Sequence, residues 1–485
     1  MSVSLLAGVL IFLAGEKRQV LRITLNIGAA VVKLALIGVI AMVVLDGREP
    51  EFRLALLPTL ELVLRTDALS LLFSTLSAVL WLVTTIYAIA YLENSPNRAR
   101  FFGFFSICVA ATMGVASAGN LFTFFLFYEL LTLATWPLVV HSGTTAAFQG
   151  GRTYLRYTLG GSAVFLFGII WLYGLSGIQD FTVGGYLADL DTAHRGELQV
   201  IFVLLMVGMG VKAALVPLHS WLPKAMVAPA PVSALLHAVA VVKAGAFGLV
   251  RLVEDVYGPS FAHELGMDTV LAVVAAVTIV YGSVLALYQT DLKKRLAFST
   301  VSQVSYIALG VAVGGAIATT GGMVHLVHQG LMKITLFFGA GIFAALLGVT
   351  RIDQLDGVGR RLPWSSGAFT VGALGMIGLP PIAGFVSKWH IGLGSVETGQ
   401  TWVVGVLVTS TLLNAAYFLP ILKRMWLHPV PESWPGGHAV SRAEVIGLVA
   451  PAVFTAALAL AAGLLTGFTL SPLTWVIDVV EVYVP

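Results

Sequence analysis

The stretch LFTFFLFYELLTLATWPLVV, residues 121–140, is a continuous apolar run with a single charged residue, Glu129, near its centre. A helix of about 20 such residues is long enough to cross the hydrocarbon core of a bilayer. A carboxylate at that depth costs roughly 2.5–3.5 kcal/mol on insertion scales. The run therefore predicts a transmembrane helix whose acid has a partner or a function that offsets this cost.

The composition of the whole chain is that of a polytopic membrane protein. Hydrophobic residues make up 58 % of its 485 residues, charged residues 11 %, and the mean hydropathy is +0.93. This leaves too little polar surface for a soluble protein of that length. The lone cysteine, Cys108, cannot form an internal disulfide or hold an iron–sulfur cluster, and no nucleotide-binding motif is present. We expect no cofactor, no bound metal and no nucleic-acid partner.

Apolar runs of spanning length predict an all-α protein with about fourteen transmembrane helices. We expect residues 1–100 to hold the first three, residues 101–253 the next five, residues 254–424 five more, and residues 425–485 the fourteenth helix with a tail. The first run is short for a span. The expected spans are residues 3–14, 23–45, 67–92, 101–118, 120–141, 154–177, 199–222, 230–253, 268–288, 297–315, 319–348, 366–391, 401–422 and 445–468.

The basic residues between these spans support the count and predict an orientation. Seventeen of the 21 loop Lys and Arg follow odd-numbered spans, and only Arg48, Arg53, Arg65 and Arg195 follow even-numbered ones. Cytoplasmic loops carry an excess of Lys and Arg. The partition therefore predicts both termini on the non-cytoplasmic side of a bacterial cytoplasmic (inner) membrane.

Apart from Arg156, which lies at the start of its span and is counted with the loop before it, six of the 27 Lys and Arg fall inside the expected spans: Lys33, Lys212, Lys243, Arg251, Lys333 and Lys388. Lys33 and Arg251 lie nearer helix ends, where we expect their side chains to snorkel to the interface. The other four lie deep, and Glu129 is the only acid that we expect deep in a span. A single buried lysine is equally consistent with a structural role, as one member of a charge pair. One acid with four lysines instead indicates an ion or proton pathway.

Helix-breaking residues adjoin two of these lysines. In GVKAALVPLHSWLPKA, Pro217 follows Lys212 by five residues, and in GLPPIAGFVSKWHIG a group of Gly and Pro residues precedes Lys388. Proline removes a backbone hydrogen bond and opens a helix locally. Paired interruptions in a membrane protein are typical of a transport site built from repeats. We expect broken seventh and twelfth spans, which, being five spans apart, belong to two inverted five-helix repeats.

Histidines complete the polar set. His219 follows Lys212 by seven residues, His237 precedes Lys243, and His325 and His328 lie on the eleventh span. Their ordinary pKa near 6.5 suits a proton relay. For each of them, a structural role as a buried histidine with satisfied hydrogen bonds is equally consistent with the sequence. Metal binding is disfavoured, because lysines rather than carboxylates or thiols accompany them.

Several stretches resemble the proton-translocating antiporter subunit family. That family includes the A and D subunits of the Mrp cation/proton antiporters and the antiporter-like membrane subunits of respiratory complex I and of membrane-bound hydrogenases. The length of the chain and a Lys at position 388 are most similar to the D subunit of Mrp antiporters. The stretches are DALSLLF (67–73), FYELLTLATWPLV (127–139), VKAALVPLHSWLPKAMVAPAPVSALLHAVAVVKAG (211–245), DLKKRLAFSTVSQVSYIALG (291–310), HLVHQGLMKITLFFGAG (325–341) and GLPPIAGFVSKW (378–389).

The resemblance implies a pathway of named residues. Glu129 would pair with Lys212, Lys243 would continue the path, and Lys388 would end it. The polar residues that the family carries on its eleventh span are matched by His325, His328 and Lys333. The implied partners are other membrane subunits of a hetero-oligomeric complex, with protons and a monovalent cation as cargo.

Three functions are then open. The first is a proton-translocating subunit of a multisubunit Na⁺/H⁺ antiporter of Mrp type, which is not an enzyme. The second is the proton-pumping membrane subunit of a complex I-like NADH:quinone oxidoreductase or a hydrogenase, driven by electron transfer in other subunits. The third is a membrane scaffold whose charges only hold partner helices.

Overall fold

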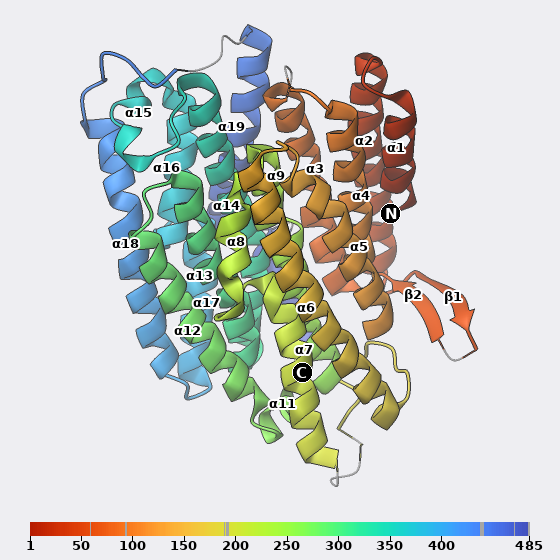
Figure 1. The fold of residues 1–485 in the computed structure, drawn as a ribbon. Coiled ribbons are helices and arrows are strands. Elements are labelled where there is room, and N and C mark those ends of the chain that lie inside the picture. The colour runs from red at the N-terminus through yellow and green to blue at the C-terminus, as the bar shows by residue number, and fades with distance from the viewer. Residues whose placement is uncertain are drawn as a thin grey trace.

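The computed structural model describes residues 1–58, 60–92, 95–188, 190, 194–436, 441–469 and 471–483. About 78 % of the protein is helical, and the helices form one elongated bundle (Figure 1). The all-α architecture expected from the sequence is confirmed. In the first half of the chain the elements are α1 (Ser2–Ala14), α2 (Gln19–Leu45), β1 (Glu51–Leu57), β2 (Leu60–Arg65), α3 (Ala68–Tyr91), α4 (Arg98–Ala116), α5 (Leu121–Val139), α6 (Thr145–Ser176) and α7 (Arg195–Ala213).

The second half begins with short pieces and continues with long helices. They are η2 (Leu218–Ser220), α8 (Trp221–Lys224), η3 (Ala225–Val227), α9 (Ala230–Ala238), α10 (Val241–Arg251), η4 (Leu252–Tyr257), α11 (Pro259–Glu264), α12 (Met267–Leu287), α13 (Leu292–Val313), α14 (Ala316–Leu347), η5 (Ile352–Gln354), α15 (Val358–Arg361), α16 (Pro363–Ile377), α17 (Ala383–Glu397), α18 (Trp402–Leu427), α19 (Arg442–Leu464) and α20 (Pro472–Tyr483).

Within the described residues, twelve helical segments are long and apolar enough to cross a membrane. The first expected span is the shorter α1, and the twelfth is covered by α16 and α17 together. The count of fourteen therefore stays a prediction. Several helices begin earlier than expected: α6 starts at Thr145 rather than 154, because the Thr144 hydroxyl accepts a hydrogen bond of 3.1 Å from the Ala147 N–H and caps it.

Two elements of the structure were not predicted from the sequence. Strands β1 and β2 form an antiparallel hairpin, with Glu51 opposite Arg65, that projects from the side of the bundle (Figure 1). The Val63 N–H of β2 donates to the Thr123 hydroxyl of α5 at 2.9 Å, and this bond anchors the hairpin to the bundle. The helix α20 lies in the part of the sequence where only a tail was expected after the fourteenth helix. It packs against α14 and α3. Its 12 residues are too few for a span, so the hydropathy pattern did not show it.

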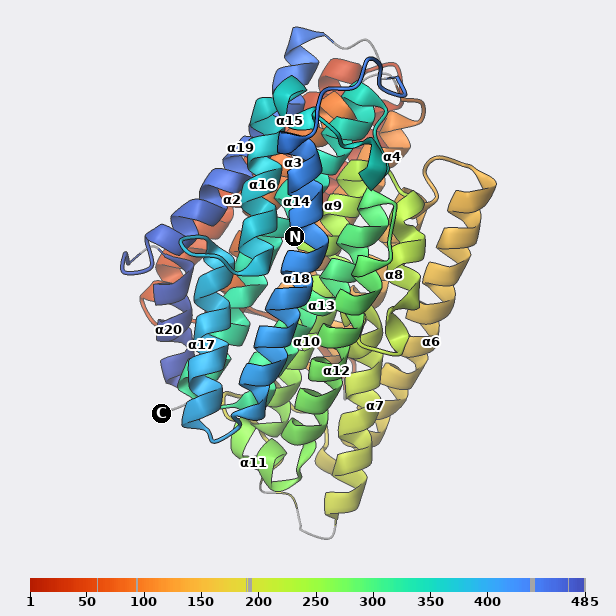
Figure 2. The same ribbon diagram turned by 90° about the vertical axis from the view of Figure 1, so that its left-hand side faces the viewer.

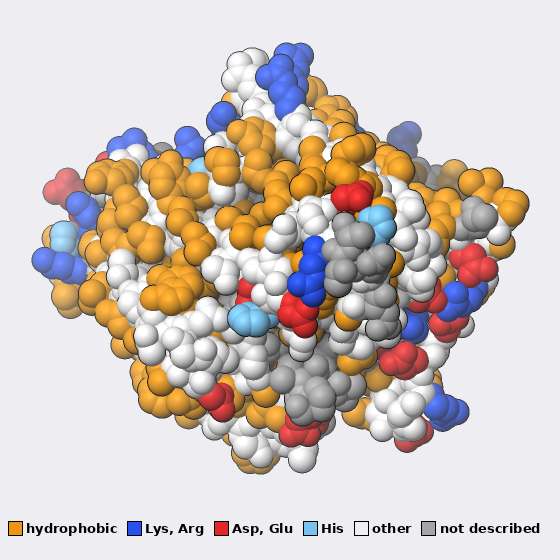
Figure 3. Space-filling model, turned by 90° about the horizontal axis from the view of Figure 1, so that it is seen from below, with side chains coloured by type: hydrophobic (Ala, Val, Ile, Leu, Met, Phe, Trp, Pro, Cys, Tyr) orange, Lys and Arg blue, Asp and Glu red, His pale blue; other side chains and the backbone are white. Residues whose placement is uncertain are grey.

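The two ends of the bundle carry different loops. The short helix α15, with Arg360 and Arg361, lies at the upper end in Figure 1, and α11 lies at the lower end. Seen from below, acidic and basic side chains are scattered between hydrophobic ones (Figure 3). The helix α15 follows the eleventh expected span and α11 follows the eighth, so these two loops, one after an odd-numbered and one after an even-numbered span, lie at opposite ends. Which end faces the cytoplasm stays a prediction.

The interior is organised around α14. This helix packs against α13, α17, α19, α9, α16 and α20, and its middle is shielded from the surface (Figure 2). The segment Ala230–Tyr257, which contains α9 and α10, is completely enclosed, whereas α2 exposes most of its surface. Polar groups on α10 and α14 therefore lie in the driest part of the bundle.

The expectation that Arg251 and Lys33 snorkel is wrong. Arg251 is 1 % exposed, and its guanidinium lies 2.8 Å from the Asp67 carboxylate and 2.7 Å from that of Asp255. Lys33 is buried on α2, with its Nζ 5.6 Å from the centre of the Trp81 ring. Arg251 stays inside because η4 extends its helix beyond residue 253 and because Asp67, which caps α3, faces it.

We predict that Arg251→Ala strongly destabilises the protein. The substitution leaves the two buried carboxylates of Asp67 and Asp255 without this partner, a change that typically costs about 3–5 kcal/mol. Arg53→Ala is the matched control, because Arg53 contacts three acids but its side chain is 43 % exposed. Thermal unfolding of the detergent-solubilised protein should show a large fall in Tm for the first variant and a small one for the second. Equal falls would contradict a structural role for Arg251.

Candidate functional site

Glu129 and Lys212 form an ion pair between α5 and α7. The Glu129 Oε1 atom lies 3.8 Å from the Lys212 Nζ, and the Ser162 hydroxyl of α6 donates to the same oxygen. The Lys212 ammonium also donates to the Tyr128 carbonyl and lies 3.2 Å from the centre of the Tyr128 ring. Lys212 is fully buried, and the Glu129 side chain is 19 % exposed. The carboxylate therefore lies at the edge of a dry site that the lysine occupies.

Lys212 lies in the last turn of α7, where the helix is interrupted. The helix ends at Ala213, and Ala214 has a φ of 59°, which an L-residue rarely adopts. Side chains satisfy the freed backbone: the Trp221 indole donates to the Val211 carbonyl at 2.7 Å, and the Val216 N–H donates to the Thr278 hydroxyl at 3.0 Å. Interrupted backbone at membrane depth needs such partners. The break expected in the seventh span is confirmed.

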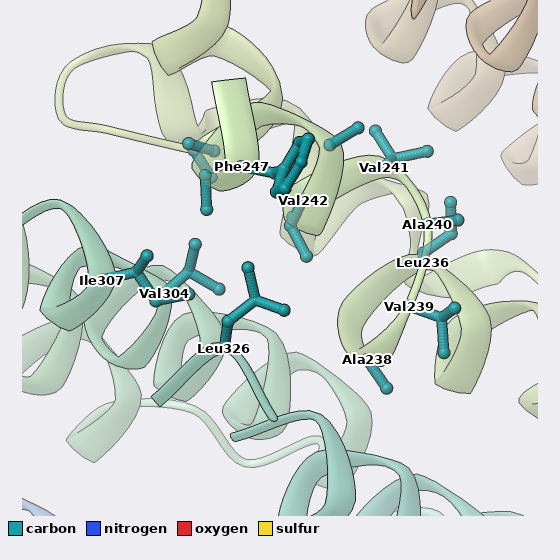
Figure 4. Close-up of a cluster of buried hydrophobic side chains, with 14 of the residues drawn as sticks. Leu236, Ala238, Val239, Ala240, Val241, Val242, Phe247, Val304, Ile307 and Leu326 are labelled. Carbon is teal, nitrogen blue, oxygen red and sulfur yellow. The ribbon is translucent and has the colours of Figure 1, made fainter. Parts of the chain in front are cut away.

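A second break lies in the eighth span, where none was expected. The helix α9 ends at Ala238 and α10 begins at Val241, in a stretch without Gly or Pro. Lys243 lies in the first turn of α10 and donates to the Leu326 carbonyl of α14 at 2.8 Å. Apolar side chains of α9, α10, α13 and α14 surround this break, with Leu326 among them (Figure 4). The Lys243 ammonium thus has a backbone acceptor in a dry environment.

Gly245 allows the helices of Lys212 and Lys243 to meet. A Cβ atom on Gly245 would lie 2.2 Å from the Ala213 nitrogen and 2.8 Å from the Lys212 carbonyl carbon. No side chain fits in that space, so α10 passes directly over the end of α7. The close approach brings the two lysines onto adjoining backbone segments.

Lys388 contacts the third break, which separates α16 from α17. Its Nζ donates to the Met376 carbonyl at 2.9 Å and to the Ile377 carbonyl at 3.0 Å. These carbonyls belong to the last turn of α16, where they have no partner within the helix and where the helix dipole favours a cation. Gly378 follows with a φ of 96°, and a Cβ there would lie 2.9 Å from the Lys388 Cδ. The break expected in the twelfth span is confirmed.

His325 on α14 lies between segments that carry or contact Lys243 and Lys388. Its Nδ1 lies 2.7 Å from the Ser387 hydroxyl, next to Lys388, and its neighbour Leu326 accepts the bond from Lys243. The centre of the Tyr306 ring lies 5.2 Å from the centre of the His325 ring and 5.2 Å from the Lys388 Nζ. The half-buried Glu129 and the buried Lys212, Lys243, His325 and Lys388 thus lie on neighbouring segments. We call these five groups the central row.

The remaining sequence candidates lie outside this row or beside it. Lys333, also on α14, donates to the Ser299 hydroxyl at 2.7 Å and to the Leu296 carbonyl at 3.2 Å. His237 stacks on Phe337, and the ring nitrogens of His237 and His328 have no hydrogen-bond partner among the described residues. His219 lies beyond the first break, on η2, so the helical spacing to Lys212 does not apply.

Glu254 and Ser162 are further buried polar residues that were not predicted from the sequence. Glu254 is fully buried on η4, and neither of its carboxylate oxygens has a hydrogen-bond partner among the described residues. Two adjacent acids, Glu254 and Asp255, are typical of the polar end of a span, so the sequence pattern did not indicate that Glu254 is buried. Ser162 gave no signal because a serine in an apolar helix is ordinary. Within the described chain, no three His, Cys, Asp or Glu side chains are placed to hold a metal ion.

Comparison with known proteins identifies the family. The family model described as NADH:quinone oxidoreductase/Mrp antiporter, TM matches residues 118–414. The chain belongs to this family. The resemblance inferred from the sequence stretches is therefore confirmed, and the chain is a multi-pass membrane protein with relatives in multisubunit membrane complexes.

Relatives in this family include antiporter and oxidoreductase subunits. The N subunit of NADH-quinone oxidoreductase from Desulforudis audaxviator is 37 % identical over 376 residues, 75 % of this chain and 72 % of that one. The D subunit of a Na(+)/H(+) antiporter from Bacillus subtilis is 28 % identical over 411 residues, 83 % and 80 % of the two chains. A chain of the Mrp complex from Dietzia sp. DQ12-45-1b superposes with a TM-score of 0.86 at 26 % identity, covering 99 % of this chain and 96 % of that one.

We predict that Gly378→Ala is more damaging than Gly399→Ala. Both glycines have a positive φ, which costs an alanine roughly 1–2 kcal/mol. At Gly378 the new Cβ also collides with Lys388, whereas at Gly399 it meets nothing within 4 Å. Thermal unfolding of the solubilised protein should therefore show the larger fall in Tm for Gly378→Ala. Equal Tm values would mean that Lys388 does not occupy the space above Gly378.

Proposed function

We propose that the chain is the proton-translocating subunit of a multisubunit Na⁺/H⁺ antiporter of Mrp type. The observation that carries the proposal is the Glu129–Lys212 ion pair at the end of an interrupted helix. Ionisable groups inside membranes usually serve proton or ion pathways, and interrupted helices commonly form transport sites. The similarity to a chain of the Mrp complex over nearly its whole length supports the same assignment.

The ion pair acts as a switch in this proposal. While Glu129 is near, its negative charge favours the charged form of Lys212. When the pair separates, Lys212 keeps only the Tyr128 carbonyl and ring as partners in a dry site, and it releases its proton. Because Glu129 is the more exposed partner, it can move toward the surface while Lys212 stays enclosed.

The released proton passes along the central row. Lys243 receives it while bound to the Leu326 carbonyl, and His325 connects that site to Ser387 and Lys388. Lys388 holds the proton at the carbonyls of α16. Transient water is proposed to cross the gaps between these groups. His237, His328 and Lys333 adjoin the row as accessory relay groups, and His219 serves proton entry near the first break.

Membership of the family supports a proposal for the wider setting of the chain. We propose that the chain assembles with other membrane subunits in a bacterial cytoplasmic membrane, with both termini on the non-cytoplasmic side, and that it is not itself an enzyme. Residues 101–253 and 254–424 are proposed as the two inverted repeats. The left-handed residues Ala214 and Gly378, each followed three residues later by a proline, support this correspondence.

A second function is the proton-pumping membrane subunit of a complex I-like oxidoreductase. The 37 % identity to the N subunit of an NADH-quinone oxidoreductase favours it. The two functions differ in what drives proton movement. An antiporter collapses a pH gradient when Na⁺ is added without any electron donor, whereas a redox-driven subunit moves protons only when an electron donor and a quinone are supplied.

The test is Na⁺-dependent collapse of a pH gradient in inverted vesicles from cells that express the whole complex and lack other antiporters. We expect collapse without an electron donor. Glu129→Gln should slow it on the order of tenfold or more, because a charge pair at this distance is worth more than the roughly 1.4 kcal/mol that a tenfold change requires. Glutamine keeps the shape and the acceptor for Ser162. Glu397→Gln, at an exposed acid, is the matched control. Unchanged exchange in Glu129→Gln would refute the switch.

A set of substitutions at Lys388 separates a relay from a scaffold. Lys388→Arg should fail, because guanidinium keeps its charge above pH 12 and cannot release a proton in turn. Lys388→His and Lys388→Glu should keep partial exchange with a shifted pH optimum, since both groups titrate. A scaffold predicts the reverse, with Arg tolerated best and Glu worst. Initial exchange rates against pH, at equal amounts of assembled complex, decide between the two orders.

A further inference from the structure

A chain of hydrogen bonds connects Lys333 with the carbonyl that holds Lys388. The Lys333 Nζ bonds the Ser299 hydroxyl at 2.7 Å, and that hydroxyl lies 2.8 Å from the hydroxyl of Tyr417. The Tyr417 hydroxyl lies 2.5 Å from the Asn414 Oδ1, and the Asn414 amide donates to the Met376 carbonyl at 3.1 Å. Lys388 donates to the same carbonyl at 2.9 Å. The chain thus joins α14, α13, α18 and α16 to α17.

The Met376 carbonyl fixes the orientation of Asn414. A carbonyl can only accept, so the NH₂ group of Asn414 must face it, and the amide oxygen must face Tyr417. The Asn414 oxygen also can only accept. When this contact is made, the single proton of the Tyr417 hydroxyl is used for it, and Ser299 must then donate to Tyr417.

Two proton arrangements are consistent with this geometry. When Lys333 is protonated it can only donate. Lys333 then donates to Ser299, Ser299 donates to Tyr417, and Tyr417 donates to Asn414. When Lys333 is neutral its lone pair can accept from Ser299, Ser299 can accept from Tyr417, and Asn414 loses its donor. The Tyr417 hydroxyl is within bonding distance of both Ser299 and Asn414, so it can serve either arrangement without moving.

The hydrogen-bonded chain from Lys333 to Asn414 lies in a dry environment, so the two proton arrangements differ in energy. Lys333, Ser299, Asn414 and Tyr417 are all fully buried, so water does not compete with the chain. The charged groups that act on Lys333 or on the backbone of Tyr417 are Lys243 of α10, His237 of α9 and Arg295 of α13, which donates to the Tyr417 carbonyl at 3.1 Å. Other elements packed against α14 carry Tyr87 and Tyr91 (α3), Lys388, His390 and Glu397 (α17), Arg442 and Glu444 (α19), and Asp478 and Glu481 (α20), while α16 carries none.

We propose that Tyr417 is a two-way hydrogen-bond switch that makes the hold of the protein on Lys388 depend on whether Lys333 carries a proton. A donor at its oxygen makes an amide a better donor through its nitrogen. In the first arrangement Asn414 therefore competes more strongly with Lys388 for the Met376 carbonyl. A charge on Lys333 thus favours release of the proton from Lys388. Ser299, Tyr417 and Asn414 are positioning residues, and the inference rests on the proposed function only where Lys388 carries the transported proton.

Infrared spectroscopy of the purified full-length chain with isotope-labelled tyrosine tests the switch without any transport. The C–O stretching band of a tyrosine depends on whether its hydroxyl donates or accepts, and Tyr417→Phe identifies the band of Tyr417. We expect this band to shift as pH is raised. Lys333→Arg, which stays protonated, and Lys333→Met, which cannot bond Ser299, should both abolish the shift.

Tyr87 provides the matched control for this measurement. Its hydroxyl donates at 3.1 Å to the Phe338 carbonyl of α14, an acceptor that leaves no alternative. The Tyr87 band, identified by Tyr87→Phe, should not move with pH. A Tyr417 band that is independent of pH, or whose shift persists in Lys333→Met, would overturn the proposal even if Na⁺/H⁺ exchange is confirmed.

Exchange measured against pH tests the consequence for Lys388. Tyr417→Phe removes the donor of Asn414, so the Met376 carbonyl is more available to Lys388. We expect half-maximal exchange to shift by about half a pH unit or more toward higher pH, as the loss of one hydrogen bond implies. Tyr87→Phe should leave the profile unchanged. An unchanged profile in Tyr417→Phe, or a shift toward lower pH, would contradict the coupling.

Discussion

The ammonium groups of Lys212, Lys243 and Lys388 lie where neither lipid nor bulk water offers a partner, so the protein must supply the acceptors. A buried ion without partners is very costly, and backbone carbonyls in an intact helix are already bonded. Interrupting a helix frees the carbonyls near its end, and Lys388 uses those at the end of α16 in this way. Lys212 and Lys243 instead donate to carbonyls inside intact helices, Tyr128 of α5 and Leu326 of α14, whose oxygens each have a second lone pair. Lys212 also has the Glu129 carboxylate.

These acceptors differ in the charge that they bring. Lys243 and Lys388 are held by neutral carbonyls, whereas Lys212 alone has a carboxylate within ion-pair distance among the described residues. A neutral acceptor stabilises an ammonium less than a negative one, so a lysine held by carbonyls gives up its proton more readily. The proposed direction of control follows from this difference: a movement of Glu129 changes one lysine, and the others respond through the central row. Gly245 and Gly378 keep the backbone segments close enough for these contacts.

The sequence predicted the features that depend on local pattern. The apolar runs located the helices, Pro217 and the glycines around Pro380 indicated two of the three breaks, and the deep lysines indicated the buried polar groups. The break before Lys243 was missed because HAVAVV contains no helix breaker. The segments on its two sides pack against different helices, α9 against α14 and α10 against α7, which the local sequence does not show. Arg251 was misjudged because its partner Asp67 is 184 residues away, and the connection from Lys333 to Asn414 depends likewise on residues brought together only by the fold.

If Glu129 and Lys212 stabilise each other's charge, their effects on stability must be coupled, which a double-mutant cycle of thermal unfolding measures. Glu129→Gln, Lys212→Met and the double variant are compared with the unaltered protein in the solubilised complex. Removing one member of a buried pair is costly, whereas replacing both by neutral groups is often nearly neutral. We expect each single substitution to lower Tm and the double variant to regain most of the loss. Losses that simply add would show that the two residues are independent and would contradict the coupling.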